Sequence, residues 1–108
     1  MNVELRPGRL DDAPALGRIC YEAFKAIADE HNFPPDFPNA EIAAGMLSTM
    51  LPHPQFYSVV AELDGRVVGS NFLDERASVS GVGPITVDPQ TQNSGIGRRL
   101  MLDVMERS

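Results

Sequence analysis

Hydrophobic and polar positions at the start of the chain predict a short strand followed by an amphipathic helix. Residues 3–6 alternate and then meet Pro7-Gly8, the pattern of a strand that ends in a turn. Asp11 or Asp12 can cap a helix that runs to about Asp29. Its apolar residues recur every three or four positions and therefore share one face. They are Leu16, Ile19, Cys20, Ala23, Phe24 and Ile27.

A proline-rich segment and a second helix come next. Three prolines within residues 31–38 remove backbone donors and disfavour helical geometry, so the first helix cannot continue there. Asn39 is placed to cap a second helix that ends before Pro52 and Pro54. Its inward-facing residues are expected to be Ile42, Met46, Leu47 and Met50.

Three strand-like runs follow the second helix. Residues 56–63 and 66–73 flank Asp64-Gly65, a strong signal for a type I′ hairpin. Residues 80–87 predict a further strand, which Gly83-Pro84 makes irregular. Because proline cannot donate to a ladder, this strand is expected to have an edge, a bulge or a neighbour that has diverged from it.

The most informative stretch joins this strand to a final helix. The β-formers at residues 85–87 are stopped by Asp88-Pro89, and apolar residues recur with helical spacing from Ile96 onward. Between them, Gly95 and Gly97 have no Cβ, so an anion can approach the main chain closely. At a helix N-terminus the N–H groups lack helical acceptors and the dipole favours negative charge. The pattern therefore predicts a phosphate-binding loop.

Two common phosphate-binding loops do not fit this sequence. A dinucleotide-binding fingerprint needs a third glycine where this chain has Leu100. A P-loop needs Gly-Lys-Ser/Thr, and the only lysine of the chain is Lys25. A phosphate binder of another kind stays open.

Length and composition predict one globular domain over residues 1–108. Hydrophobic residues make up 43% of the chain and charged residues 22%, which argues against disorder. The net charge of −6 argues against nucleic acid or an anionic membrane as the main partner and would suit a cationic acceptor such as an amine. One cysteine excludes an internal disulfide, and no apolar run has membrane-spanning length, so we expect a cytoplasmic location.

The glycine loop resembles motif A of the GNAT family of N-acetyltransferases, Q/R-x-x-G-x-G/A. Here the motif reads Gln92-Asn93-Ser94-Gly95-Ile96-Gly97, and a strand ending in Val87-Asp88-Pro89 precedes it. The predicted order of elements along the whole chain is also similar to that family. The resemblance implies an α/β fold with a mixed, mostly antiparallel sheet flanked by helices (β-α-α-β-β-β-α).

The family fold continues with a fifth strand, a helix and two more strands, which this sequence does not contain. By resemblance, residues 1–108 are expected to be a single acetyltransferase domain that is truncated at its C-terminus, with the C-terminal strands absent. An uncovered strand edge and helix face would then invite a second copy, as in a homo-oligomer, or a complementing C-terminal segment.

The resemblance implies transfer of an acetyl group from acetyl-CoA to an unidentified primary amine, by direct attack in a ternary complex. Main-chain groups of Ile85, Thr86 and Val87 would lie along the pantetheine arm. The pyrophosphate would be held by the loop and the first turn of the helix. These residues are Gln92, Asn93, Ser94, Gly95, Ile96, Gly97 and Arg98. The alternative is a non-catalytic acyl-CoA-binding or interaction module.

The catalytic residues are unknown at this point. The family often places a glutamate on or beside the fourth strand, and residues 80–87 contain none. The nearest carboxylates are Asp74, Glu75 and Asp88, each of which also fits a solvated turn residue. The loop with Phe33 and Phe37 lies where the family recognises its acceptor, and it also fits a hydrophobic lid.

Other conspicuous residues have simpler interpretations. Cys20 is expected in the core, and no metal site is expected because His31 and His53 have no Cys, Asp or Glu at ligand spacing. Arg98 or Arg99 could reach the phosphates of CoA. The methionines with helical spacing are expected to fill the core. They are Met46, Met50, Met101 and Met105.

Overall fold

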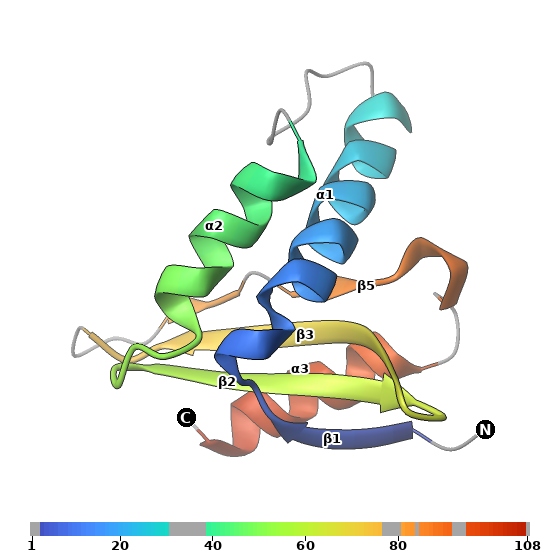
Figure 1. Cartoon of the computed structure of the whole chain (residues 1–108). Coiled ribbons are helices and arrows are strands. Elements are labelled where there is room, and N and C mark those ends of the chain that lie inside the picture. Colours follow the sequence, from blue (N-terminus) through green and yellow to red (C-terminus); the bar gives the residue numbers. More distant parts are fainter. Residues whose placement is uncertain (1–2, 31–38, 77–80, 84, 92–94, 108) are drawn as a thin grey trace.

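The computed structural model describes residues 3–30, 39–76, 81–83, 85–91 and 95–107, and it contains one sheet with helices on both faces (Figure 1). Helices α1 (Ala13–Glu30) and α2 (Ala40–Met50) cover one face, and α3 (Ile96–Arg107) covers the other. The strands are β1 (Val3–Pro7), β2 (Phe56–Leu63), β3 (Arg66–Asp74), β4 (Gly81–Val82) and β5 (Thr86–Val87). The short 3-10 helices η1 (Leu10–Asp12) and η2 (Pro89–Thr91) precede α1 and follow β5. The element order confirms the predicted α/β class.

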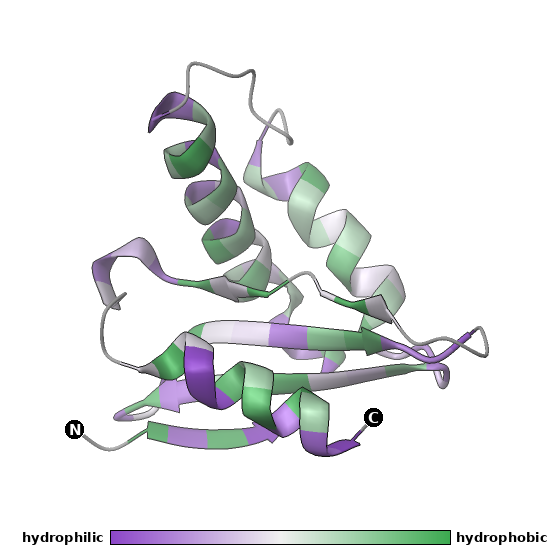
Figure 2. Cartoon of the chain, turned by 180° about the vertical axis from the view of Figure 1, so that it is seen from behind, coloured by the Kyte–Doolittle hydropathy of each residue, from purple (hydrophilic) through white to green (hydrophobic). Residues whose placement is uncertain are grey.

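Each face of the sheet buries its own hydrophobic cluster. Successive residues of β2 point to opposite faces, so Val60 packs under α1 and α2 while Val59 and Ala61 pack against α3. The middle of the sheet is therefore buried on both sides, which explains why residues 58–61 and 68–73 lack a polar alternation. Figure 2 shows hydrophilic and hydrophobic residues alternating along α1 and α3, as expected for helices with one buried face, whereas α2 is mostly hydrophobic.

The hairpin between β2 and β3 has the predicted type I′ character. Asp64 has φ +52° and Gly65 has φ +84°, and both central residues of such a turn need positive φ. The strands β1, β2 and β3 pair antiparallel in sequence order from one edge, with Leu63 opposite Arg66 at the turn. This meander forms most of the sheet, and its register shifts between Ala61 and Glu62, where β3 has one extra residue.

The strand predicted over residues 80–87 is divided into β4 and β5 by a bulge. Ser70 pairs with Thr86 and Leu73 pairs with Val82, so four steps along the outer segment oppose three steps along β3. Gly83 takes up the extra length with φ +119°, and its N–H donates to the Phe72 carbonyl at 2.8 Å. The predicted irregularity is thus confirmed at Gly83, whereas Pro84 lies outside the described residues.

Helices α1 and α2 pack closely through small residues. A Cβ atom at Gly17 would stand 2.4 Å from the Cβ of Ala44, so only glycine permits this approach. The contact turns Ala43 and Leu47 of α2 into the core and leaves Ile42 outside, 53% exposed. The expectation that Ile42 faces inward was therefore wrong. Asn39 caps α2 as predicted, since its side-chain oxygen accepts the Ile42 N–H at 2.9 Å.

The core assignments of the sulfur-containing residues are mostly confirmed. Cys20 is 1% exposed, and Met46 and Met50 pack against the cluster under α1 and α2. Met105 is 59% exposed and was wrongly expected in the core. The buried face of α3 is occupied by Leu100 and its neighbours one turn away, so the adjacent position 105 points outward.

Helix α3 is held to the sheet by polar contacts as well as by packing. The Tyr57 hydroxyl on β2 donates to Asp103 at 2.5 Å, and the buried Asn71 amide on β3 donates to the Leu100 carbonyl at 3.3 Å. Arg107 lies over the Tyr57 ring, 4.9 Å from its centre. These contacts fix the position of α3, whose first turn borders the pocket described below.

The Tyr57 contact predicts that the stability of the fold decreases in alkaline solution. Burial, together with the hydrogen bond to Asp103, raises the pKa of Tyr57 from 10.0 to about 12. A raised pKa in the folded protein contributes stability below pH 10.0, and this contribution is lost as the pH rises toward about 12. We expect the free energy of unfolding, measured with urea, to fall more between pH 9 and 11 in wild type than in Tyr57→Phe. Substitution of the other tyrosine, Tyr21→Phe, is the control and should follow wild type; equal pH dependence in all three proteins would refute the assignment.

Candidate functional site

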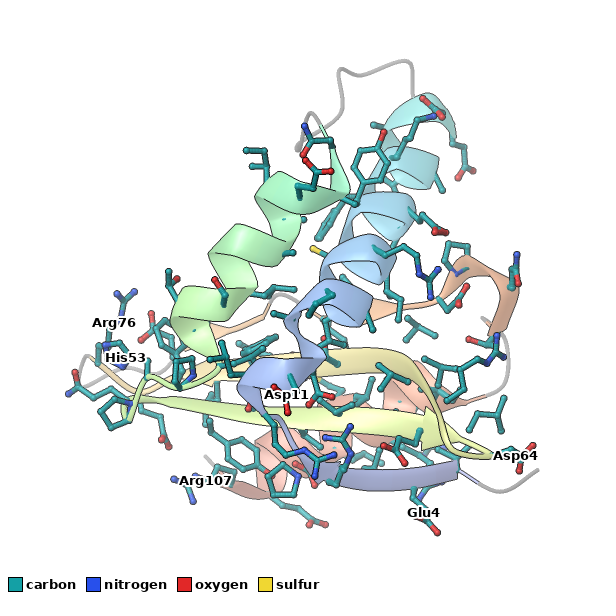
Figure 3. All side chains as sticks on the ribbon, viewed as in Figure 1. Glu4, Asp11, His53, Asp64, Arg76 and Arg107 are labelled. Atoms are coloured by element: carbon teal, nitrogen blue, oxygen red, sulfur yellow. The ribbon has the colours of Figure 1, made fainter. Side chains whose placement is uncertain are left out.

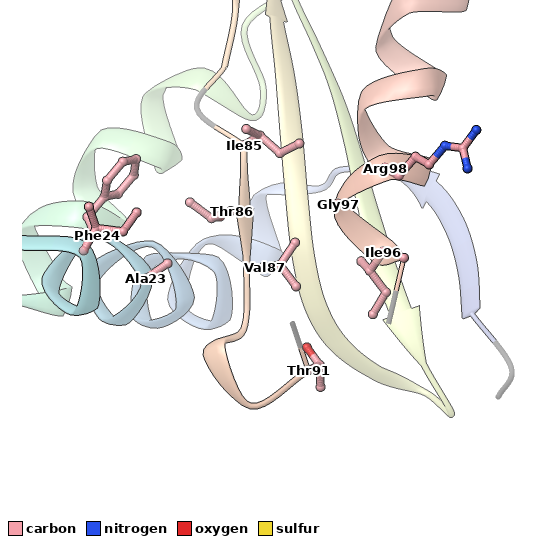
Figure 4. A pocket seen from close by; sticks show the side chains of 11 residues that line it. Ala23, Phe24, Ile85, Thr86, Val87, Thr91, Ile96, Gly97 and Arg98 are labelled. Carbon is pink, nitrogen blue, oxygen red and sulfur yellow. The ribbon is translucent and has the colours of Figure 1, made fainter. Parts of the chain in front are cut away.

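A pocket of about 360 Å³ lies beside β5, at the edge of the described sheet, and reaches from α1 to the start of α3 (Figure 4). Three segments and the residue Thr91 form its lining. The lining residues are Ala23, Phe24 and Ile27 of α1, Ile85, Thr86 and Val87 around β5, Thr91, and Gly95, Ile96, Gly97 and Arg98 at the start of α3.

The first turn of α3 contributes the polar main-chain end of the pocket. Gly95 has φ +82°, and its carbonyl accepts the Arg99 N–H at 3.2 Å, which places Gly95 immediately before the helix. The N–H groups of Ile96, Gly97 and Arg98 therefore belong to the first helical turn, where no acceptor exists within the helix. Together with the helix dipole they favour an anion at this end of the pocket.

The strand side of the pocket depends on a close approach between β3 and β5. A Cβ atom at Gly69 would stand 2.8 Å from the Thr86 carbonyl oxygen and 3.2 Å from the Leu100 side chain. The absence of a side chain at Gly69 thus lets β5 lie against both β3 and α3. Because Thr86 pairs with Ser70 of β3, peptide groups beside Thr86 turn to the outer edge of the sheet, where the pocket lies.

The third side of the pocket is an apolar surface on α1, called the α1 wall below and made of Ala23, Phe24 and Ile27. Sequence reasoning placed these residues in the core only. Helix α1 has 18 residues and α2 has 11, so α2 is too short to cover α1 along its whole length. Ile27 is 53% exposed and borders the pocket instead. The unequal lengths of two packed helices are the sequence signal that could have identified this wall.

Asp88 organises the turn that carries the chain from β5 toward the glycine loop. Its N–H donates to the Val68 carbonyl at 2.7 Å, and its carbonyl accepts the Thr91 N–H at 2.8 Å. Asp88 as a whole is 2% exposed. Its carboxylate accepts the Gln90 N–H at 3.0 Å and lies 3.8 Å from the Arg18 guanidinium of α1. One buried residue therefore connects β3, the η2 turn and α1.

Seven of the predicted cofactor-binding residues line this single pocket. They are Ile85, Thr86, Val87, Gly95, Ile96, Gly97 and Arg98. The other three, Gln92, Asn93 and Ser94, lie outside the described residues. The structure brings these seven residues together in one pocket, and their binding of a cofactor remains a prediction.

The carboxylates considered as bases do not line the pocket. Arg76 binds Asp74 at 2.7 Å and lowers the pKa of that carboxyl from 3.8 to about 2. Arg76 and His53 lie together at the end of the sheet opposite Asp64 (Figure 3). Glu75 pairs with Arg107 at 3.3 Å, and Asp88 is held in its turn. All three carboxylates have structural partners.

The two arginines at the start of α3 have different surroundings. Arg99 donates to the Val3 carbonyl of β1 at 3.0 Å, whereas Arg98 lines the pocket.

His53 accepts the Gln55 N–H at 3.0 Å through Nδ1. Within the described ranges no group of three metal-ligating side chains occurs, and no helix is long and apolar enough to cross a membrane. His31, Phe33 and Phe37 lie outside those ranges.

Comparison with known proteins identifies a family for most of the chain. The model of the acetyltransferase (GNAT) family matches residues 18–108. No curated protein matches the sequence.

Solved structures with similar folds cover 98% of the chain. A GNAT family acetyltransferase from Brucella melitensis, in complex with acetyl-CoA, has a TM-score of 0.74 at 22% identity, with 98% of this chain and 68% of that chain covered. The PaiA N-acetyltransferase from Thermoplasma acidophilum, in complex with coenzyme A, has a TM-score of 0.79 at 17% identity, with 98% and 71% covered. Glucosamine-6-phosphate N-acetyltransferase from Arabidopsis thaliana has a TM-score of 0.62 at 10% identity, with 98% and 74% covered. These similarities show the fold.

The contacts of Asp88 predict a large effect for its removal. Asp88→Ala leaves the Gln90 N–H and the nearby Arg18 without the carboxylate, and we expect a loss of about 1–3 kcal/mol in the free energy of unfolding. Asp29→Ala, which removes an exposed partner of Lys25 on α1, is the matched control and should change stability little. Urea unfolding at pH 7 measures both; equal effects of the two substitutions would contradict the organising role of Asp88.

Proposed function

This chain belongs to the acetyltransferase (GNAT) family, whose model covers residues 18–108, and we propose that it transfers an acetyl group from acetyl-CoA to an amine. The observation that carries the proposal is the continuity of one pocket from the first turn of α3 to the outer side of β5. Acetyl-CoA combines a diphosphate with an amide-bearing arm, and these two chemical parts match the two polar sides of the pocket. The neighbours in complex with acetyl-CoA and with coenzyme A support the same ligand.

In this proposal the start of α3 binds the diphosphate. The N–H groups of Ile96, Gly97 and Arg98 would donate to its oxygens, and the helix dipole would favour its charge. Among the described residues, and apart from the backbone of α3 itself, the nearest atom to a Cβ placed at Gly97 would be Val87 Cγ2, at 3.7 Å. The main chain at Gly97 is therefore open to a ligand on that side.

The outer side of residues 85–87 would bind the pantetheine arm. An extended amide-bearing chain can pair with the edge of a sheet as an added strand does. The bulge at Gly83 ends this binding edge, so the thioester would lie near Ile85. Bound acetyl-CoA supplies the acetyl group, and attack by a neutral amine forms the C–N bond while the C–S bond breaks and the CoA thiolate leaves. Positioning by the pocket would provide much of the rate acceleration.

Removal of the amine proton is the step without an assigned residue. An alkylammonium has a pKa of about 10, so a base or a water chain must take its proton at neutral pH. Asp74 is a poor candidate, because Arg76 lowers its pKa to about 2. The second candidate function, a non-catalytic acyl-CoA-binding module, is favoured by the structural pairing of Asp74, Glu75 and Asp88.

Binding of coenzyme A tests the site directly. We expect calorimetry to give a micromolar Kd for CoA, and Gly97→Leu to weaken binding at least about tenfold by placing a side chain in the pocket. Gly97→Ala is the matched control, because its Cβ fits at ordinary van der Waals distance, and it should change Kd less than about threefold. The absence of binding heat with millimolar CoA would refute the proposal. If ADP, which lacks the pantetheine arm, competed for the site as well as CoA does, the protein would be a different kind of phosphate binder.

Thiol release separates the enzyme from the binding module. With acetyl-CoA and a panel of small amines and peptides, the proposed transferase should release free CoA faster than the hydrolysis background. Gly97→Leu should lower this rate in parallel with its loss of CoA affinity. Tight CoA binding without amine-dependent release would support the non-catalytic module.

A further inference from the structure

We propose that the α1 wall receives the acyl chain of an acyl-CoA, so that this protein accepts acyl groups longer than acetyl. The inference rests on the proposed function and adds the class of acyl donor to it. Phe24 and Ile27 are the residues expected to set the preference for chain length.

The argument begins with the path that the pocket follows around the sheet edge. Helix α3 covers one face of the sheet and α1 covers the other (Figure 1). The pocket joins the first turn of α3 to α1 past β5, and Figure 4 shows Ala23 and Phe24 across β5 from Gly97 and Arg98. A ligand with its diphosphate at the start of α3 and its arm along β5 therefore directs its far end toward the α1 wall.

The chemistry of that far end is hydrocarbon. The α1 wall presents the side chains of Ala23, Phe24 and Ile27, and Ile85 lies at the same pocket. Arg98, the charged residue among the described lining, belongs to the opposite end. An unbranched acyl chain would gain free energy by leaving water here, whereas a charged group would lose its hydration and find no hydrogen-bonding side chain among Ala23, Phe24 and Ile27.

The two main residues of the wall differ in a useful way. Phe24 is half-buried and packs against the cluster under α1 and α2, so it forms a fixed base. Ile27 is 53% exposed, although it lies on the apolar face of α1. A chain of methylene groups against Ile27 would remove apolar surface of both partners from water, which a two-carbon acetyl group achieves to a smaller extent.

The first test measures binding of a series of donors without any acceptor amine. Calorimetry with CoA, acetyl-CoA, butyryl-CoA and hexanoyl-CoA should show Kd falling with chain length, by up to about fourfold for each buried methylene, which corresponds to about 0.8 kcal/mol. The absence of an amine excludes acceptor effects. Equal Kd values for acetyl-CoA, butyryl-CoA and hexanoyl-CoA would overturn the inference while leaving the proposed function intact, and no binding of any member would overturn both.

A matched pair of substitutions tests the residues. Ile27→Ala shortens the wall and should remove most of the gain in affinity with chain length, which is measured for each variant relative to its own Kd for CoA. Ile42→Ala is the control, because Ile42 is equally 53% exposed but lies on α2 outside this pocket. It should keep the wild-type dependence on chain length. Thermal unfolding of both variants monitors folding, and the same dependence on chain length in both variants would refute the assignment to Ile27.

Discussion

One extra residue in the strand beside the pocket breaks the regular pairing of the sheet. Four steps from Val82 to Thr86 must lie along three steps of β3, and a regular ladder cannot accommodate this difference. Gly83 absorbs it in a conformation with φ +119° that is costly for residues with a Cβ. The segment that lines the pocket, from Ile85 to Val87, begins directly after this irregularity. The bulge therefore separates the strand into a short end piece and a piece that lines the pocket.

The electrostatic character of the pocket is local and differs from that of the whole chain. The net charge is −6, yet several carboxylates are paired with arginines or used inside turns. At the pocket itself the relevant charges are the positive end of α3 and Arg98. An acidic protein can thus favour an anion locally, because amides in direct contact act on it at full strength whereas salt screens surface charges more than about 10 Å away.

The sequence predicted the elements that local patterns determine. Alternation and the Asp64-Gly65 turn predicted the β2–β3 hairpin, and the two glycines predicted the start of α3 at Ile96. What could not be predicted depends on how helices pack against each other. The close contact of Gly17 with Ala44 decides which face of α2 is buried, and it excludes Ile42 from the core. The α1 wall was missed for the same reason, since an apolar residue such as Ile27 has the same pattern beside a pocket as in a core.

The glycine at position 69 has a consequence for how this sequence can change over time. A Cβ atom at Gly69 would lie 2.8 Å from the Thr86 carbonyl oxygen and 3.2 Å from a Leu100 methyl group. The elements β3, β5 and α3 therefore meet at this one position. A larger residue there would force the backbone at position 86 to move, whereas the Leu100 side chain would have to give by only a few tenths of an ångström. Even the single methyl group of alanine at position 69 would therefore strain the junction of the two strands and the helix.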